Sequence, residues 1–497
     1  MSSTGWSRAL LAAALLTAGC GRPDSEAPPL VVDAIGEERA ARLVAQATRI
    51  GLTRLDSGGR VVPGLAQSWR VSDNGLFIVL RLRPLAAADG RPVRAADIAR
   101  ALERHRTSGT PEARRLLDGV EAVLAPLDEV LEIRLTTPQP ELLEILALPE
   151  VAVMAEGRGR QAIPSLPGAY REVAEAEDRK STQPGILLER DEGFFDAGNV
   201  RQPRARVQAA EPQAAVQRFR RGETDLVLGG LVNGVSEARV GAPRDALVLE
   251  RTRATLLLAI NHAHPMLGNL LVRQALDRSI DRSRVGRAIY GGDQALPVHA
   301  LTPPGLSGMP DAPIPDWSLL PLADRQSDAQ RRLLEAGLPE GERLQLRLAT
   351  GDSVEEERAA AALVASWAPI GVDIIVERRR RERHAAAVAD GKFEMALTIV
   401  EGPVDSPLPF LDWLRCGRNR LQVCLPEADE LLARARNEPT LAARMEAIAL
   451  AERLWLDEVS AIPLIQPLRW SLVGRRVQGF QPNAAGVHPL AFLWRQD

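Results

Sequence analysis

The sequence predicts an α/β protein built from two or three lobes. Segments with the two-residue periodicity of strands alternate along the chain with segments whose apolar spacing is helical. The chain has 497 residues, of which 45% are hydrophobic, so it has ample apolar surface to bury. A chain of this length usually forms more than one core, and we therefore expect several lobes.

Strands are predicted where apolar residues alternate with other residues. In segment 76–83 leucine or isoleucine occupies every second position, and segment 344–348 repeats the pattern with leucine. Because successive side chains of a strand point to opposite faces, this spacing gives one buried face. Three further strands are expected at 130–135, 372–376 and 393–400.

Helices are predicted between these strands. Ser327 and Gln330 have the spacing of a capping box, and Gly337 follows the apolar pair Leu333 and Leu334, so a helix is expected from Ser327 to Ala336. Further helices are expected at 94–105, 428–436 and 441–456.

The first twenty residues have the features of an export signal. Arg8 precedes the apolar run Ala9 to Leu16, which is far shorter than the roughly 20 residues that span a bilayer. The run ends in Leu16-Thr17-Ala18-Gly19-Cys20, which resembles a bacterial lipoprotein box. We expect residues 1–19 to be cleaved and Cys20 to carry the lipid. The alternative is an ordinary cleaved signal with an incidental cysteine.

Residues 20–29 are polar and rich in proline, and we expect them to form a solvated tether. The globular part then begins near Leu30. No later stretch is apolar enough to cross a membrane, so the predicted contact with the membrane is the lipid anchor alone.

The two remaining cysteines, Cys416 and Cys424, lie close together in a loop-like stretch. In the oxidising compartment that an export signal implies, we expect them to form a disulfide. A metal site would need more ligands than two thiols, and no histidine lies nearby in the sequence.

Many short motifs along the chain resemble, in order, those of solute-binding protein family 5, the extracytoplasmic dipeptide, oligopeptide and nickel binders of ABC importers. No single motif is decisive, but together they span essentially residues 30 to 497. They are Gly51–Asp56, Val62–Trp69, Ser72–Leu76, Asp89–Val93, Gly222–Asp225, Leu258–Asn261, Val272–Leu276, Ile280–Arg282, Leu333–Gly337, Gly371–Val372 and Ile462–Leu464.

The resemblance implies a two-lobed periplasmic-binding-protein type II fold of cluster C, with an extra inserted domain and a hinge between the lobes. The lobes would close over the ligand, which removes water from the polar groups of the cleft. The implied boundaries are 30–62, 181–257 and 471–497 for lobe I, 63–180 for the inserted subdomain, and 258–470 for lobe II. The ligand would be a peptide or similar small polar solute, delivered by a monomer to the permease of an ABC importer.

The ligand site is expected to differ from that of the family. After the strand that ends near Ile399, the family commonly carries a tryptophan and then an aspartate that pairs with a peptide's amino group, but Val400 and Pro403 stand at these positions. Glu401 or Asp405 would then supply the carboxylate, unless both are solvated loop charges.

Two more candidate ligand contacts lie in the N-terminal half. Glu37 lies where the family has a loop that floors the cleft, because the strand at 31–35 runs straight into a helix. Tyr170 follows Gly168 and Ala169 near the family's glycine-rich stretch, and would either contact ligand or lie in the core.

Other functions are less well supported. The 62 basic and 65 acidic residues nearly cancel, which argues against nucleic-acid binding. The spacing Gly157-x-Gly159-x-x-Ala162 is that of a dinucleotide loop, but Pro164 and Pro167 follow where its helix must begin. We expect no catalytic site and no cofactor, and a hydrolase is the weakest alternative.

Two further alternatives remain open. His262 and His264 would share one side of a strand and could bind Ni²⁺ or Zn²⁺, although we expect no metal site. Because the expected cleft wall is altered, the protein could also be a lipoprotein that keeps the scaffold as a sensing or interaction module without transport.

Overall fold

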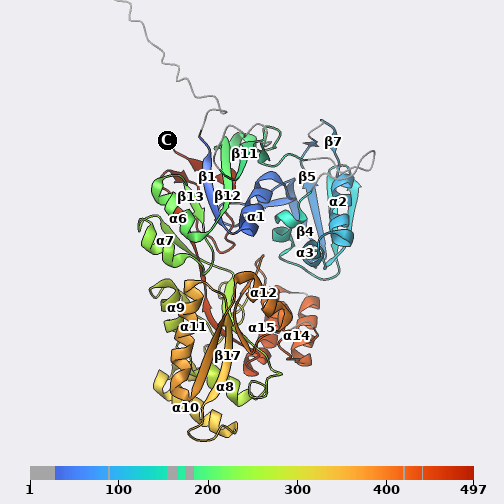
Figure 1. Ribbon diagram of the computed structural model, residues 1–497. Helices are drawn as coiled ribbons and strands as arrows, with labels where there is room; N and C mark the ends of the chain where they lie inside the picture. Colours follow the sequence, from blue (N-terminus) through green and yellow to red (C-terminus); the bar gives the residue numbers. More distant parts are fainter. Residues whose placement is uncertain are drawn as a thin grey trace, which may run out of the picture.

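The computed structural model describes residues 28–87, 90–153, 166–173, 184–417, 420–438 and 440–496. The expected leader, Cys20 and most of the tether lie outside these residues, as does the Gly157 to Pro164 stretch. Figure 1 shows two α/β bodies one above the other, with a third, smaller sheet beside the upper one. Among the described helices none is long and apolar enough to cross a bilayer.

The upper body is built on a seven-stranded mixed sheet in the order β10-β11-β12-β1-β13-β21-β14. Strand β1 runs parallel to both β12 and β13, and the remaining pairings are antiparallel. Its strands are β1 (Leu30–Ile35), β10 (Tyr170–Glu172), β11 (Ile186–Arg190), β12 (Arg204–Ala210), β13 (Leu226–Leu228), β14 (Leu247–Arg251) and β21 (Leu468–Val473), and its helices are α1 (Glu37–Thr48), α6 (Pro212–Arg221) and α7 (Val235–Gly241).

The lower body is built on a six-stranded sheet in the order β16-β20-β15-β19-β17-β18. Buried apolar residues cover both faces, since Leu256 and Leu258 of β15 belong to one hydrophobic cluster and Leu257 and Ala259 to another. The strands are β15 (Ala254–Ile260), β16 (Leu296–Pro297), β17 (Leu344–Thr350), β18 (Val372–Arg378), β19 (Met395–Glu401) and β20 (Ala461–Gln466). The helices that cover them are α8 (Leu270–Ser279), α9 (Arg282–Tyr290), α10 (Leu322–Glu335), α11 (Val354–Trp367), α12 (Arg381–Asp390), α14 (Pro426–Asn437) and α15 (Leu441–Asp457).

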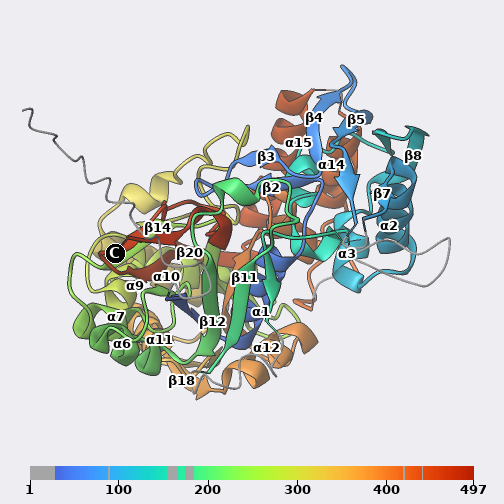
Figure 2. The same cartoon turned by 90° about the horizontal axis from the view of Figure 1, so that it is seen from above.

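The third sheet is a four-stranded antiparallel unit, β4 (Ala66–Val71), β5 (Phe77–Leu82), β9 (Val130–Leu135) and β8 (Val120–Leu127), covered by α2 (Ala95–Ser108). It lies to one side of the seven-stranded sheet in Figure 2. Its buried residues, such as Leu80 and Leu131, belong to the same hydrophobic cluster as Leu30 and Val32 of β1. The two sheets therefore share one core, which is the arrangement expected of a subdomain inserted in the first lobe.

The expected lobe boundaries stay a prediction. Two of them divide the seven-stranded sheet. Strand β10 lies inside the range expected for the inserted subdomain, yet it pairs with β11 in the seven-stranded sheet. The first residues of β21, from Leu468, also pair within that sheet, although the expected boundary was 471.

Most expected elements are present, and one expected boundary is wrong. The alternating segment at 76–83 forms β5, and the segment at 344–348 forms β17. The helix expected from Ser327 begins five residues earlier, at Leu322 after Pro321. Ser327 lies inside the helix, where its hydroxyl donates a hydrogen bond of 3.0 Å to the carbonyl of Ala323, so it does not cap the helix.

Two short crossover segments join the two large sheets. One lies between β14 and β15, and the other between β20 and β21. The Thr252 hydroxyl donates to the Pro467 carbonyl at 2.5 Å, and the Gln466 side-chain amide donates to the Thr252 carbonyl at 2.8 Å. Both bonds are buried, so the crossovers form one cross-linked hinge.

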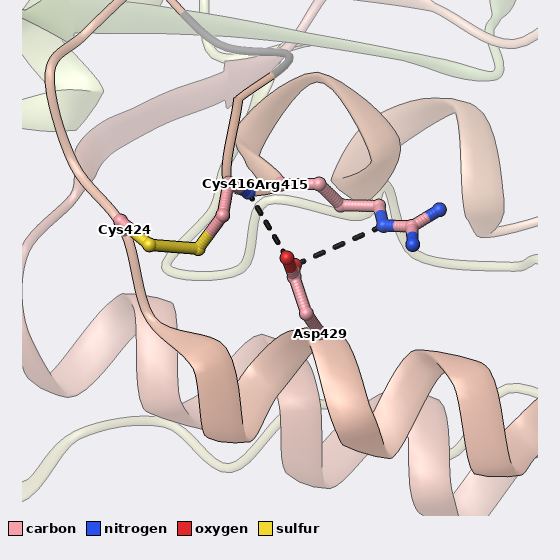
Figure 3. The surroundings of a disulfide bond; sticks show 4 residues. All are labelled: Arg415, Cys416, Cys424 and Asp429. Carbon is pink, nitrogen blue, oxygen red and sulfur yellow. Dashed lines mark hydrogen bonds and ion pairs between the residues drawn. A yellow bond between two sulfur atoms is a disulfide. The ribbon is translucent and has the colours of Figure 1, made fainter.

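A disulfide joins Cys416 and Cys424, whose Cα atoms lie 4.6 Å apart (Figure 3). The loop that it closes is tied to the first turn of α14 by Asp429, whose carboxylate accepts a hydrogen bond of 3.1 Å from the Cys416 amide and lies 3.8 Å from Arg415. The disulfide thus stabilises the segment that leads into α14.

Replacing both cysteines by alanine should lower the free energy of unfolding by about 2.5 kcal/mol, because the unfolded chain loses the constraint of the closed loop. Urea unfolding in oxidising buffer measures the change. Wild-type protein in reducing buffer is the control and should match the double variant. Equal stability of the wild type in the two buffers would contradict the prediction.

Candidate ligand-binding site between the lobes

The carboxyl ends of parallel strands from both large sheets meet near the hinge. In the upper sheet β1 and β13 end at Ile35 and Leu228, and in the lower sheet β17 and β19 end at Thr350 and Glu401. Helix α12 of the lower body lies on the side that faces the upper body in Figure 1. Ligands of open α/β sheets bind outside the carboxyl ends of the strands, so this region is the candidate site.

A buried arginine lies where the two carboxyl edges meet. Arg469, the second residue of β21, is 3% exposed, and its Nη2 donates to Oε1 of Glu401 at 2.5 Å. The Glu401 side chain is 47% exposed, so the site opens to solvent there. A Cβ atom added at Gly486 would lie 1.7 Å from the Arg469 Nη1, so this glycine leaves the space that the guanidinium occupies.

A second arginine, Arg39 in the first turn of α1, interacts electrostatically with this pair. Burial is the main cause that lowers the pKa of Arg39 to about 9, and the charge of Arg469 acts in the same direction while Glu401 opposes it. Within the described residues the Arg39 side chain makes no hydrogen bond or ion pair. The charges of Arg469 and Glu401 thus both act on Arg39, while Glu401 is in contact with Arg469 alone.

The neighbouring acidic group has its own partner. Glu250 of β14 lies opposite Arg469 in the sheet, but its carboxylate is 3.0 Å from Nε2 of His488, and both side chains are almost fully buried. The His488 ring stacks on Phe480 with ring centroids 4.3 Å apart. Glu250 and His488 thus form a rigid wall of the site.

A cavity of about 390 Å³ is lined by residues of both bodies, and the residues of the charged cluster are not part of its lining. Val232, in the segment after β13, contributes from the upper body, and the floor and sides come from β15, β19, α11 and α12. The lining is mostly apolar, with Leu256, Ala359 and Leu397 among its residues. Such a chamber suits an apolar ligand group.

Helix α11 holds the two bodies together next to the hinge. Glu355 is 1% exposed and accepts hydrogen bonds from the amides of Gly234 and Ser236, at 3.3 and 2.9 Å. One turn further along, Arg358 donates to the Ser236 hydroxyl at 2.8 Å. These bonds fix the start of α7 against the lower body.

A second set of contacts joins the inserted subdomain to the lower body. Glu144 accepts from Nη1 of Arg253 at 2.5 Å and from the amide of Asp405 at 2.8 Å. Glu141 lies 3.4 Å from Arg444 of α15. The lower body is therefore anchored on both sides of the charged cluster.

Comparison with known proteins agrees with this architecture. The profile of the bacterial extracellular solute-binding proteins, family 5, matches residues 60–421. The chain belongs to this family. It is 25% identical over 457 residues to di/tripeptide-binding protein 2 of Pseudomonas aeruginosa, which covers 85% of this chain and 84% of that relative.

Solved structures of similar proteins show the same fold. OppA of Burkholderia pseudomallei superposes with a TM-score of 0.77 at 22% identity, covering 95% of this chain and 100% of that one. OppA of Haemophilus influenzae, in complex with the peptide RPPGFSPFR, gives a TM-score of 0.76 at 19% identity over 94% and 99% of the two chains. The predicted two-lobed type II fold is thus confirmed.

The structure places the expected ligand contacts of this family 5 protein in different surroundings. Glu37 is exposed as the first residue of α1, and Glu401 pairs with Arg469. Asp405 accepts from the amide and hydroxyl of Ser307, at 3.0 and 2.5 Å, and so orders its own loop.

Tyr170 takes the core position of the two that its sequence context left open. It is 1% exposed, and its hydroxyl donates to the carbonyl of Gln202 at 3.0 Å and to that of Leu490 at 3.4 Å. Its pKa is raised, chiefly by burial. With its hydroxyl used by backbone groups, Tyr170 supports the wall of the upper body in this conformation.

The histidine pair of the metal alternative is engaged with the backbone. Nε2 of His262 lies 3.1 Å from the Ser460 carbonyl, and Nδ1 of His264 accepts from the Leu267 amide at 3.4 Å. Burial is the main cause that lowers the pKa of His262 to about 4. In the described part of the chain no three or more potential ligands gather around a metal position.

Sequence reasoning missed Arg39 and Arg469. Neither residue lies in a motif that marks a ligand site, and the chain is rich in arginine. Arg39 comes from the first turn of a helix and Arg469 from the last long strand, and only the sheet order brings them together. No local sequence signal could have identified this pair.

Replacing Glu355 by alanine should lower the free energy of unfolding by about 2 to 3 kcal/mol, because two buried amides lose a charged acceptor. Urea unfolding measures this loss, and small-angle scattering should show a wider distribution of lobe positions. Glu357→Ala, which removes a more exposed pair with Arg378, is the matched control and should cost less than about 1 kcal/mol. Equal effects of the two variants would argue against a special role for Glu355.

Proposed function

We propose that this family 5 protein captures a peptide or similar small polar solute between its two lobes and delivers it to the permease of an ABC importer. The observation that carries the proposal is the charged and partly apolar site at the facing carboxyl edges of two sheets joined by a hinge. A cleft between lobes buries most of a small ligand when it closes.

The relatives support a peptide as the ligand class. The similar protein of P. aeruginosa is named for di- and tripeptides, and the H. influenzae structure contains a nonapeptide. The relatives also include periplasmic murein peptide-binding protein MppA of Escherichia coli, 22% identical over 459 residues. We propose that the protein acts in the periplasm or cell envelope, as a monomer without a cofactor.

Closure would use the hinge at Thr252 and Pro467. A ligand shifts the balance between open and closed forms only by the difference in its affinity for them, so residues on both lobes must contact it. Glu37 on α1, Glu401 at the end of β19 and Asp405 in the segment after it meet this requirement by position and are proposed as contacts.

Native mass spectrometry of the purified protein, followed by calorimetry with pools of di- to pentapeptides, tests the proposal. We expect a co-purifying solute or a peptide that raises the melting temperature, because a ligand that binds the folded state alone stabilises it. The absence of bound solute together with no stabilisation by any pool would count against capture.

Filling the interlobe cavity should weaken binding of the peptide found in that experiment. Ala385 lines the cavity from an exposed position on α12, so Ala385→Trp should reduce the affinity about tenfold or more while the protein stays folded. Ala386→Trp is the matched control, since Ala386 is also exposed but does not line the cavity. Calorimetry compares the dissociation constants, and equal values would exclude the cavity from the site.

The proposed lipid anchor is tested by Cys20→Ser. We expect wild-type protein to sediment with membranes and the variant to be released, because the described part of the chain has no helix that could hold it there. Cell fractionation with immunoblotting measures the distribution. The same membrane-bound fraction for both proteins would contradict lipidation at Cys20.

A further inference from the structure

A cavity of about 780 Å³ lies in the lower body, outside the cleft between the lobes. Helix α15 forms one wall, and the segment Gly308–Trp317, which precedes α10, forms much of the other. All its lining residues lie between Asp277 and Pro463, and none of them also lines the interlobe cavity. Its volume is in the range of pockets that hold small molecules.

Most of this lining is apolar. Ala442, Ala449 and Leu456 of α15 line the cavity, and their spacing of seven residues places them on one face of the helix. The facing segment contributes Ile314 and Trp317, and its three prolines restrict its backbone. The two walls therefore suit the apolar body of a ligand.

A buried carboxyl group lines the same cavity without a countercharge. Glu452 of α15 is 3% exposed and accepts hydrogen bonds from the amide and hydroxyl of Thr302, at 2.7 and 2.9 Å. In the described part of the chain no cationic side chain forms an ion pair with it. Burial is the main cause that raises its pKa. A cation bound beside Glu452 would offset the cost of burying its charged form.

The exposed rim of the cavity is also acidic. Of the two lining arginines, Arg282 is paired with Asp277. Arg453 lies 4.0 Å from Asp457. The remaining charges are carboxylates with no ion pair among the described residues, so the rim attracts cations. These exposed lining residues are Asp311, Asp316 and Glu446.

His299, which also lines the cavity, adds no positive charge at neutral pH. Burial is the main cause that lowers its pKa to about 3, and the charges of Arg282 and Arg325 act in the same direction. Its neutral ring packs edge-on against Trp317, with ring centroids 5.4 Å apart. The unpaired charges around the cavity are therefore all negative.

We propose that this cavity is a second binding site, for a small organic cation that joins an amino group to an apolar body. The amino group binds Glu452, and the apolar body lies between α15 and the segment Gly308–Trp317. Because every lining residue belongs to the lower body, this binding does not require the lobes to close. The site goes beyond the proposed capture of a solute in the cleft.

Calorimetry with three matched probes tests this inference. They are phenylbutylamine, which carries an ammonium group at neutral pH as lysine does, the neutral phenylbutanol and the anionic phenylbutanoate. We expect the amine to bind about tenfold or more tightly than either analogue, because it alone can pair with Glu452. Equal binding of the amine and the alcohol, or no binding of the amine, would overturn the inference. Either result would leave peptide capture in the cleft standing, and a failure of peptide capture would leave this site standing.

A charge variant tests the role of Glu452. Glu452→Gln should weaken binding of phenylbutylamine about tenfold or more, because the charge that pairs with the ammonium group is lost. Glutamine keeps an oxygen that can accept from Thr302. Glu430→Gln, at an exposed residue of α14 outside the cavity, is the matched control and should leave the affinity unchanged. An unchanged affinity in Glu452→Gln would overturn the assignment.

Filling the cavity keeps the inference testable if Glu452→Gln fails to fold. Ala449 lines the cavity from a partly exposed position, so Ala449→Trp should weaken amine binding about tenfold or more. Ala443→Trp is the matched control, since Ala443 is partly exposed on the same helix but does not line the cavity. Equal amine affinities of these two variants would overturn the inference. Weaker amine binding by Ala385→Trp would place the amine in the interlobe cavity and overturn it as well.

Discussion

The hinge depends on two buried hydrogen bonds between the crossover segments, those that join Thr252 to Pro467 and Gln466 to Thr252. Because both crossovers are short, they limit how far the two large sheets can move apart. Rotation of one lobe relative to the other is confined to a few backbone dihedral angles of these segments. Buried bonds of this kind are costly to break, so the segments move as one unit. The interlobe contacts of Glu355 and Glu144 add to this link.

Close packing and hydrogen bonds around the hinge restrict the movement of the residues that surround the site. The Trp470 indole donates to the Asn233 carbonyl at 2.9 Å, and a Cβ at Gly229 would lie 2.3 Å from its ring, so glycine is needed there. The Tyr290 hydroxyl donates to the Leu231 carbonyl at 2.8 Å and accepts from the Leu468 amide at 2.9 Å. Apolar contact therefore continues from one lobe to the other at the hinge, while the charged cluster opens to solvent at Glu401.

The electrostatics of the cleft differ from what a simple countercharge to a peptide amine would give. The carboxylate expected to serve that purpose, Glu401, is held by Arg469, and Asp405 is held by Ser307 and lies 3.8 Å from Arg253. Both acidic groups are thus partly neutralised by the protein. Among the described residues, the Nε and Nη1 atoms of Arg469 have no hydrogen-bond partner.

The sequence by itself determined the fold class, the family and the local elements. Alternation at 76–83 gave a strand, Gly337 ended a helix with φ of 94°, and the order of motifs identified the scaffold, because periodicity and turn residues act over a few positions. Only the tertiary structure decided that Tyr170 lies in the core and that Glu401 is bound by Arg469. These pairings join residues that lie on different strands and segments of the chain, and their energies come from burial and charge that exist only after the sheets have assembled.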